Sequence, residues 1–510
     1  GWSSCSRDVY PRGARSCPIR QGPSSKSSMP TPAASSGCAC VCPRHRMPDA
    51  LARLGQRLTH SPRSRRWAAV LTGLVIATGH APLNLGPLAL VGLAGAVWLY
   101  SLCPGWRAAA MTGWLVGLGH FALALSWIVE PFLVDIARHG WMAPFGLVGL
   151  AGGLALFWGA AFGLAARLRL GLFGMATLWA LAELARGYVL TGFPWANIAQ
   201  IWAGGPAVQW VALFGQYGLT LVTLVLAAAA VRALARSRMA GAAVLIAGGA
   251  ALFAGGAVFQ SREVETTTRT VRLIQPNAAQ HLKWSPDHIP GFFQSKLQMT
   301  AAPGAVDLIV WPETAVPTLL EYADDAFATM AKAARGTPIV AGIQRRDSAG
   351  RYYNALITLD PGGAPDQLYD KHHLVPFGEY MPLAWLFAQI NVFGLAALEN
   401  SGYTPGPGPA LIDLGPLGRA LPLICYEAVF PQDVAGTTAR PDFLLQITND
   451  AWFGQVSGPY QHLAQARMRA IEQGLPMVRV ANTGVSAMID PVGHVTARLP
   501  LNRTGHVDAE

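Results

Sequence analysis

Three side chains suited to nucleophilic catalysis stand near the ends of apolar or β-like runs. The run 421–424 leads into Cys425, the run 308–312 leads into Glu313, and Lys371 follows a β-like stretch. A buried strand can deliver a reactive side chain at its carboxyl end. A thiol, a lysine and a carboxylate placed in this way predict a nucleophile, an electrophilic stabiliser and a base.

The chemistry of these three groups is complementary. A thiol becomes a good nucleophile only when it loses its proton, and a neighbouring cation or base promotes that loss. Lys371 would supply a positive field and stabilise an oxyanion, and Glu313 would take the thiol proton and return it to the leaving group. Residue types alone leave a second interpretation open, because a buried cysteine such as Cys425 more often only packs as a small hydrophobe.

Further polar residues interrupt apolar runs near these positions. Glu379 lies in the turn-rich loop 375–382, and Glu427 follows the cysteine by two residues. Additional carboxylates beside a lysine would hold its ammonium group in place. Asn449 and Asp450 end another apolar run, where a turn or helix cap is as good an interpretation as a role at the site.

Neither the histidines nor the N-terminal cysteines predict a metal site. His372 and His373 have no partner residues at a metal-binding spacing, so we interpret them as structural. The run Cys38, Cys40 and Cys42 lacks a second ligand cluster at the usual zinc spacing. The sequence therefore predicts no metal and no cofactor.

The composition indicates a membrane protein with a basic tail. Of the 510 residues 52% are hydrophobic and only 13% are charged, whereas soluble proteins average about 25% charged residues. Residues 1–66 hold 12 Lys and Arg against 2 acids, which accounts for the whole formal charge of +10. This argues against nucleic-acid binding and for a disordered basic flank before a membrane segment. Met47 offers a natural start, which would make residues 1–46 a leader or foreign sequence.

The region 67–262 predicts a membrane domain of about seven transmembrane helices, since several apolar stretches approach the ~20 residues that cross a bilayer. The predicted spans are 67–83, 87–104, 108–129, 143–166, 171–187, 207–231 and 241–259. Arginines gather in alternate breaks between them, which predicts a cytoplasmic N-terminus and places the region after Arg262 outside. The apolar loop 188–209 is either an interfacial segment or a packed connector.

From residue 263 to 510 short β-branched runs alternate with helical stretches, which predicts an α/β domain. The predicted strands are 270–275, 306–311, 338–343, 352–359, 420–425, 443–448, 477–481 and 485–490. The clearest helical stretches are 324–334 and 459–473.

Four strings together resemble the carbon–nitrogen hydrolase (nitrilase) superfamily. They are Trp311-Pro312-Glu313 and residues 369–379, 424–427 and 449–454, in that order. Joined to a multi-span N-terminal half, they closely resemble the bacterial apolipoprotein N-acyltransferase family. The resemblance implies an αββα sandwich with a catalytic triad of Glu313, Lys371 and Cys425. Candidates for supporting or substrate-binding roles are Trp284, Glu379, Tyr426, Glu427 and Asn449.

The reaction that the resemblance implies is acyl transfer in two halves. Cys425 would attack the sn-1 ester of a phospholipid, with phosphatidylethanolamine as the expected donor, and form a thioester. The α-amino group of a diacylglyceryl-cysteine at the N-terminus of an apolipoprotein would then take the acyl chain, which predicts ping-pong kinetics. The implied setting is the bacterial inner membrane, with a periplasmic catalytic domain and a monomeric enzyme.

The chain departs from the family pattern at both ends, since no apolar span follows the α/β region and the cysteine-containing tail is foreign to the pattern. Two other hypotheses remain open. A membrane-tethered nitrilase-type amidase would use the same triad on a small amide. A transporter or receptor with an external binding domain would instead place the intramembrane charges Glu183 and Arg186 along a pathway.

Overall fold

The computed structural model describes residues 49–382 and 402–510 of the 510-residue chain. The N-terminal cysteines of the predicted tail lie outside the described residues. The prediction of a disordered tail is wrong for residues 49–66, because α1 (Asp49–His60) and the start of α2 (Pro62–Ala77) are helical. Local sequence explains the second helix, since Ser61 caps its N-terminus and Pro62 occupies its first turn.

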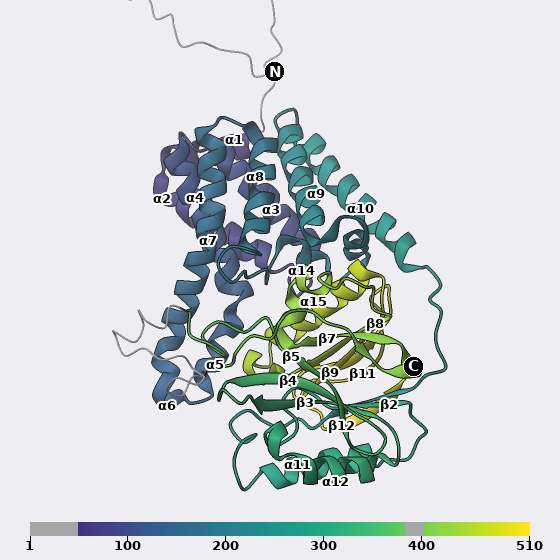
Figure 1. Cartoon of the computed structure of the whole chain (residues 1–510). Coiled ribbons are helices and arrows are strands. Elements are labelled where there is room, and N and C mark those ends of the chain that lie inside the picture. Colours follow the sequence, from purple (N-terminus) through teal and green to yellow (C-terminus); the bar gives the residue numbers. More distant parts are fainter. Residues whose placement is uncertain (1–48, 383–401) are drawn as a thin grey trace, which may run out of the picture. The chain divides into compact units, whose positions relative to one another are not determined.

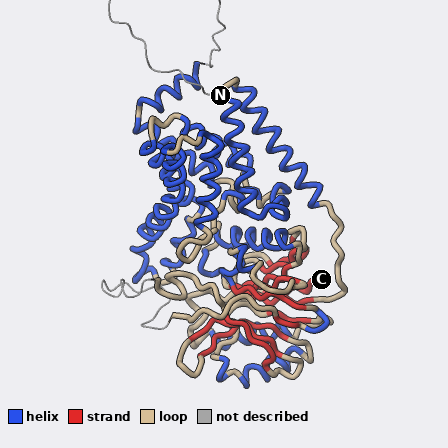
Figure 2. The backbone as a smooth tube through the Cα atoms, turned by 45° about the horizontal axis from the view of Figure 1, so that its top comes forward, coloured by secondary structure: helices blue, strands red, loops and turns tan. Residues whose placement is uncertain are grey.

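Helices make up the N-terminal half of the described chain (Figures 1 and 2). After α2 come α3 (Gly86–Ser101), α4 (Trp106–Ala124), α5 (Glu130–Leu133), α6 (Ile136–His139), α7 (Ala143–Arg167), α8 (Gly171–Arg186), α9 (Val211–Leu234) and α10 (Arg238–Gln260). Their sequences are apolar around most of the circumference, as expected for helices that pack together or face lipid.

Among the described residues, three helical segments are long and apolar enough to cross a membrane: Ile136–Arg167, Pro206–Leu234 and Arg238–Gln260. A fourth is possible if α4 and the segment Ser126–Leu133, which meet at a bend of 64°, form one broken span. The helices α2, α3 and α8 have 16 residues each, about 24 Å at 1.5 Å per residue, which is less than the ~30 Å hydrocarbon core. The predicted number of seven spans is therefore not confirmed.

The described part of the C-terminal half holds two six-stranded sheets. In one, the strand order is β12 (Gly505–Ala509), β1 (Val271–Gln275), β2 (Leu308–Val310), β3 (Ile339–Arg346), β4 (Tyr352–Leu359) and β5 (Pro365–Asp370). In the other, it is β11 (Val495–Leu499), β10 (Ser486–Ile489), β9 (Met477–Ala481), β8 (Phe443–Thr448), β7 (Arg419–Ile424) and β6 (Ile412–Asp413). Every predicted β run contains a strand.

The sheets form the two inner layers of an αββα sandwich (Figure 1). The helices α11 (Ile289–Thr300) and α12 (Asp324–Ala334) pack on the outer face of the first sheet through a core that includes Phe327 and Trp311. The helix α15 (Gly458–Gln473) packs on the second sheet through Ala466 and Ala470. Strands covered on both faces are apolar throughout, which is why their runs are visible in the sequence.

The helix α15 also joins the sandwich to the helical half. Gln461 accepts a hydrogen bond from Trp195 Nε1 at 2.7 Å and donates to the carbonyl oxygens of Ala81 at 3.1 Å and Ala124 at 3.0 Å. Trp195, in the apolar loop that the sequence left open, is fully buried and packs against Trp127 and Phe453. The loop is therefore a packed connector at this point.

Candidate active site

Three strand ends deliver the residues predicted to form the triad. Cys425 directly follows β7, Lys371 directly follows β5, and Glu313 stands three residues after β2. All three residues are buried, with exposed fractions of 5%, 1% and 6% respectively. The thiol interacts electrostatically with both Lys371 and Glu313, so the fold brings the three side chains to one site.

Two carboxylates surround the ammonium group of Lys371. Its Nζ lies 2.8 Å from Glu379 and 3.8 Å from Glu313 Oε1. Asn354 Nδ2 donates to Glu313 Oε1 at 2.7 Å and to Glu379 Oε1 at 3.1 Å, which fixes the two carboxylates relative to each other. The second oxygen of Glu313, Oε2, is buried without a hydrogen-bond partner and is free to accept a proton.

Burial is the main cause of the pKa changes of the Glu313 carboxyl group and the Cys425 thiol. It raises the pKa of Glu313, although Lys371 opposes the change. Burial also raises the pKa of the Cys425 thiol, and the charge of Glu313 raises it further. Burial alone would lower the pKa of Lys371, but Glu379 and Glu313 together raise it above its usual range. The resting site therefore combines a neutral thiol, a charged lysine and a carboxylate with increased proton affinity.

Glu427 is fully buried and holds two segments of the site together. Its Oε2 accepts from the backbone N–H of Ile424 at 2.7 Å, and its Oε1 accepts from the N–H of His372 at 2.8 Å and from the Tyr369 hydroxyl at 3.0 Å. These contacts tie the residue before Cys425 to the residue after Lys371. The structure thus places Glu427 where it aligns the predicted nucleophile and the lysine.

The remaining predicted site residues take different positions. Tyr426 is buried, and its ring meets Phe430 edge-on with centroids 4.8 Å apart. Asn449 donates to Gln280 at 2.8 Å and accepts from Asn482 at 2.8 Å, so it supports the loop that precedes Trp284. Trp284 is 41% exposed and lines a cavity beside Glu313.

Lys283 is a buried cation near the site that sequence reasoning missed. Its Nζ donates to the backbone carbonyl of Glu313 at 3.1 Å and to the Thr314 hydroxyl at 2.5 Å. Burial lowers the pKa of Lys283 to about 8, although Glu313 and Cys425 oppose this change. The only signal in the sequence is a lysine next to Trp284.

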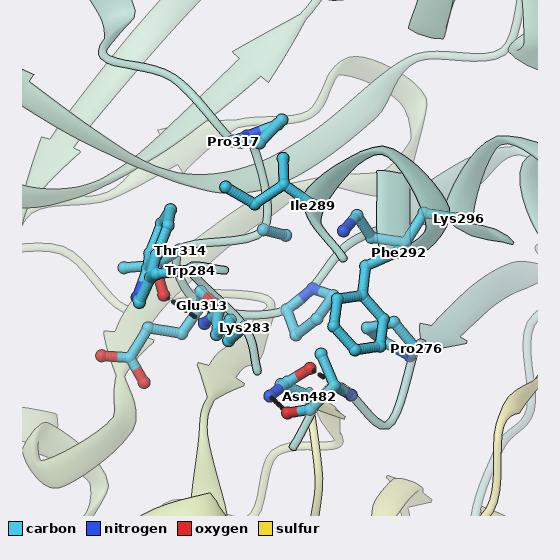
Figure 3. A pocket seen from close by; sticks show the side chains of 13 residues that line it. Pro276, Lys283, Trp284, Ile289, Phe292, Lys296, Glu313, Thr314, Pro317 and Asn482 are labelled. Carbon is cyan, nitrogen blue, oxygen red and sulfur yellow. Dashed lines mark hydrogen bonds between the residues drawn. The ribbon is translucent and has the colours of Figure 1, made fainter. Parts of the chain in front are cut away.

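Figure 3 shows the cavity that Trp284 and Lys283 line, with the carboxylate of Glu313 directed away from Lys296 and Phe292. Its volume of about 20 Å³ is enough for a single water molecule but not for an acyl chain. A long acyl chain therefore requires another path to the thiol, or movement of the Trp284 loop.

Comparisons with known proteins identify the family of the chain. The chain matches the carbon–nitrogen hydrolase family over residues 257–510 and the apolipoprotein N-acyltransferase N-terminal domain over residues 72–229. An apolipoprotein N-acyltransferase from Caulobacter vibrioides is 38% identical over 482 residues, covering 88% of this chain and 90% of the relative. One from Rhodopseudomonas palustris is 37% identical, covering 86% and 88%. This chain belongs to the apolipoprotein N-acyltransferase family.

Among solved structures, a mutant amidase of the nitrilase superfamily from Nesterenkonia AN1 is similar at a TM-score of 0.35 and 17% identity, covering 48% of this chain and 92% of the amidase. The nitrilase-like fold of this family member rests on the match to the carbon–nitrogen hydrolase family and on the two packed sheets.

The buried charges in the helical half of this acyltransferase family member are mutually satisfied. Glu183 accepts from the Arg186 guanidinium at 2.8 and 3.0 Å, from Trp158 Nε1 at 2.8 Å and from Asn197 at 2.9 Å. Arg186 also donates to the carbonyl of Trp195 at 2.8 Å. The pair shapes the connector loop and does not line an open pathway, which removes the main support for the transporter hypothesis.

Metal ligation has no structural support in the part of the chain that is described. Within residues 49–382 and 402–510, no group of three or more His, Cys, Asp or Glu is placed to hold an ion. His373 Nδ1 lies 2.7 Å from Asp433 Oδ2, and its ring stacks on Phe430 with centroids 3.6 Å apart. Its neighbour His372 lies 2.6 Å from Glu427.

Replacing Glu427 by glutamine tests its alignment role. The amide cannot accept from both Ile424 and the 372 segment, so we expect unfolding to become easier by about 1–3 kcal/mol. Burial by itself lowers the pKa of His372. The carboxylates of Asp433 and Glu427 have the larger, opposite effect and raise this pKa to about 9. The stability gained from this imidazolium is complete below its unfolded pKa of about 6.5 and lost as pH rises through about 9.

The Glu427→Gln deficit in melting temperature in detergent should accordingly be largest below about pH 6.5 and smaller above about pH 9. Glu263→Gln, at an exposed site, serves as the control and should melt like the wild-type protein. A Glu427→Gln protein that is as stable as wild type at all pH values would contradict the alignment role.

Proposed function

We propose that this protein transfers an acyl chain from a phospholipid, through a thioester on Cys425, to the N-terminal α-amino group of diacylglyceryl-cysteine in apolipoproteins. The observation that carries the proposal is the convergence of Glu313, Lys371 and Cys425 at one buried site. Family membership supports the same reaction, because the curated relatives are named apolipoprotein N-acyltransferases.

In the first half-reaction Glu313 takes the thiol proton, and the thiolate of Cys425 attacks the carbonyl carbon of the sn-1 ester. Lys371 stabilises the negative charge that develops on the carbonyl oxygen. The intermediate collapses when the C–O bond to glycerol breaks, and Glu313 returns the proton to the departing oxygen. The products are an acyl thioester on Cys425 and a lysophospholipid.

In the second half-reaction the α-amino group of the acceptor attacks the thioester carbonyl. Glu313 removes a proton from the attacking nitrogen, the C–S bond breaks, and Glu313 passes this proton to the departing thiolate of Cys425, which restores the resting thiol and the carboxylate. The acceptor leaves as an amide. Glu379 holds Lys371 charged and in place throughout, since its carboxylate lies 2.8 Å from the ammonium group.

The same proposal places the chain in the bacterial inner membrane as a multi-pass monomer. Residues 67–262 form the membrane domain, and residues 263–510 form a catalytic domain on the periplasmic side. The apolar helices and the arginine distribution between them support this arrangement. Membrane tethering suits the chemistry because both proposed substrates are anchored in lipid.

The test is acyl transfer with purified full-length protein in detergent. Phosphatidylethanolamine with an isotopically labelled sn-1 chain is the donor, and a synthetic diacylglyceryl-cysteine peptide is the acceptor. We expect the label on the peptide amine, an equal amount of lysophosphatidylethanolamine, and a thioester on Cys425 when the acceptor is omitted. Phosphatidylglycerol as a second donor tests the preference for phosphatidylethanolamine.

An amidase acting on small amides is the outcome that would overturn the proposal. It would release ammonia from acetamide or propionamide without phospholipid and leave the peptide unmodified. Label that appears in free fatty acid, with none on the peptide, would likewise exclude transfer to the amine.

A further inference from the structure

The backbone of Cys425 adopts a left-handed conformation with φ of 53°. A non-glycine residue in this region is energetically unfavourable, and the conformation persists only where the surroundings hold it. The conformation turns the chain from β7 into the short helix Cys425–Val429 and so determines where the thiol points. Groups that fix the Cys425 peptide therefore set the geometry of the nucleophile.

Two side chains from other elements contact the carbonyl oxygen of Cys425. Gln446 Nε2, from β8, donates to it at 3.1 Å, and His462 Nε2, from α15, lies 3.1 Å from it. Both side chains are fully buried. These contacts act on the backbone that carries the predicted nucleophile.

A closed ring of polar contacts holds these two side chains. His462 Nδ1 lies 2.8 Å from Asp450 Oδ1, and Asp450 Oδ2 accepts from Arg479 at 2.6 Å. Arg479 also donates to Gln446 Oε1 at 2.5 Å. Asp450 and Arg479 are 1% and 0% exposed. A buried polar network closed in this way is rigid and leaves its members one arrangement.

The helix that carries His462 is itself anchored. The preceding residue, Gln461, uses its amide to bind Trp195, Ala81 and Ala124 in the helical half. Of these two adjacent residues of α15, Gln461 therefore binds the helical half and His462 contacts the Cys425 peptide. This makes α15 a fixed support for the nucleophile.

We propose that His462 is a positioning residue that holds the Cys425 peptide in its left-handed conformation and so aims the thiol at the ester carbonyl. The inference rests on the proposed role of Cys425 as nucleophile. In this role His462 acts through the Cys425 carbonyl oxygen, which lies 3.1 Å from its Nε2.

A matched pair of variants separates positioning from packing. In His462→Gln the amide nitrogen can replace Nε2 and contact the Cys425 carbonyl, whereas in His462→Asn it replaces Nδ1 and contacts only Asp450. We expect His462→Asn to slow thioester formation at saturating phosphatidylethanolamine by about 10²-fold with KM unchanged, as a small misplacement of a reacting group does. His462→Gln should recover most of that loss.

A role limited to packing against Trp195 and Phe453 predicts equal effects, because both variants lose the imidazole ring. Wild-type rates in His462→Asn, or a His462→Gln rate no higher than that of His462→Asn, would overturn the inference. Cys425→Ala separates this failure from that of the proposed function. If Cys425→Ala still makes product the proposed function falls, whereas an inactive Cys425→Ala beside a fully active His462→Asn removes the positioning role alone.

If His462→Asn does not fold, Gln446→Met gives a second test, since it removes the Gln446 amide that donates to the same carbonyl and leaves His462 in place. The expected result is slower thioester formation with unchanged KM. An unchanged rate in a folded Gln446→Met protein would overturn the role assigned to this carbonyl.

Discussion

Replacing Cys425 by alanine is expected to lower acyl transfer by about 10³-fold or more, because loss of a nucleophile removes the covalent route as a whole. The thioester should be absent even when the acceptor peptide is omitted. The removed group is a single buried sulfur with a 5% exposed side chain, so the fold should survive. The measurements are label transfer to the peptide and mass analysis of the fragment that contains residue 425.

The control for this variant is Cys103→Ala, the other cysteine within residues 49–382 and 402–510. Its sulfur lies 3.4 Å from the Thr112 hydroxyl in the helical half, away from the triad. Transfer by Cys103→Ala should match wild type. Turnover retained by a folded Cys425→Ala protein would contradict a thioester mechanism.

Replacing Glu313 by glutamine is expected to reduce kcat/KM by about 10²–10⁴-fold, the usual contribution of a positioned general base. The glutamine can still accept from Asn354, and the Lys371–Glu379 pair at 2.8 Å is left in place. The variant therefore removes the base with little change to the surrounding contacts. Glu265→Gln, at an exposed site, is the matched control and should keep wild-type activity.

The pH dependence of kcat/KM gives a second test of Glu313 as the general base. Glu313 accepts a proton only as the carboxylate, so wild-type kcat/KM should fall as pH decreases through its pKa. Because burial raises the pKa of Glu313, this acid limb should lie above the ordinary glutamate value of about 4.3. The limb should vanish in Glu313→Gln. A variant that retains both the rate and the acid limb would show that another group is the base.

Several strands and helices could be predicted from the sequence because the residue patterns that indicate them are local. Strands covered on both faces need continuous apolar runs, so β7 and β8 were predicted close to their observed bounds. The helix Asp324–Ala334 matched its prediction residue for residue. The strands β5, β6, β11 and β12 were missed, because their partly exposed residues interrupt the apolar pattern.

The number of membrane spans was harder to predict from the sequence, because hydropathy measures apolar character and does not show where a helix begins and ends. Apolar stretches such as 171–187 contain a helix of only 16 residues, and the loop around Trp195 owes its apolar character to burial between helices. The buried pair Glu183–Arg186 likewise suggested a pathway until its partners were visible.

The sequence by itself determined the residue types of the candidate triad, their order along the chain and the strands that precede them. Only the tertiary structure decided that Glu313, Lys371 and Cys425 share one buried site, because they are far apart in the chain and meet through two sheets. The contacts that Lys283, Glu427 and His462 make could likewise be identified only from the tertiary structure. Each depends on distances between segments remote in sequence, for which composition and periodicity carry no signal.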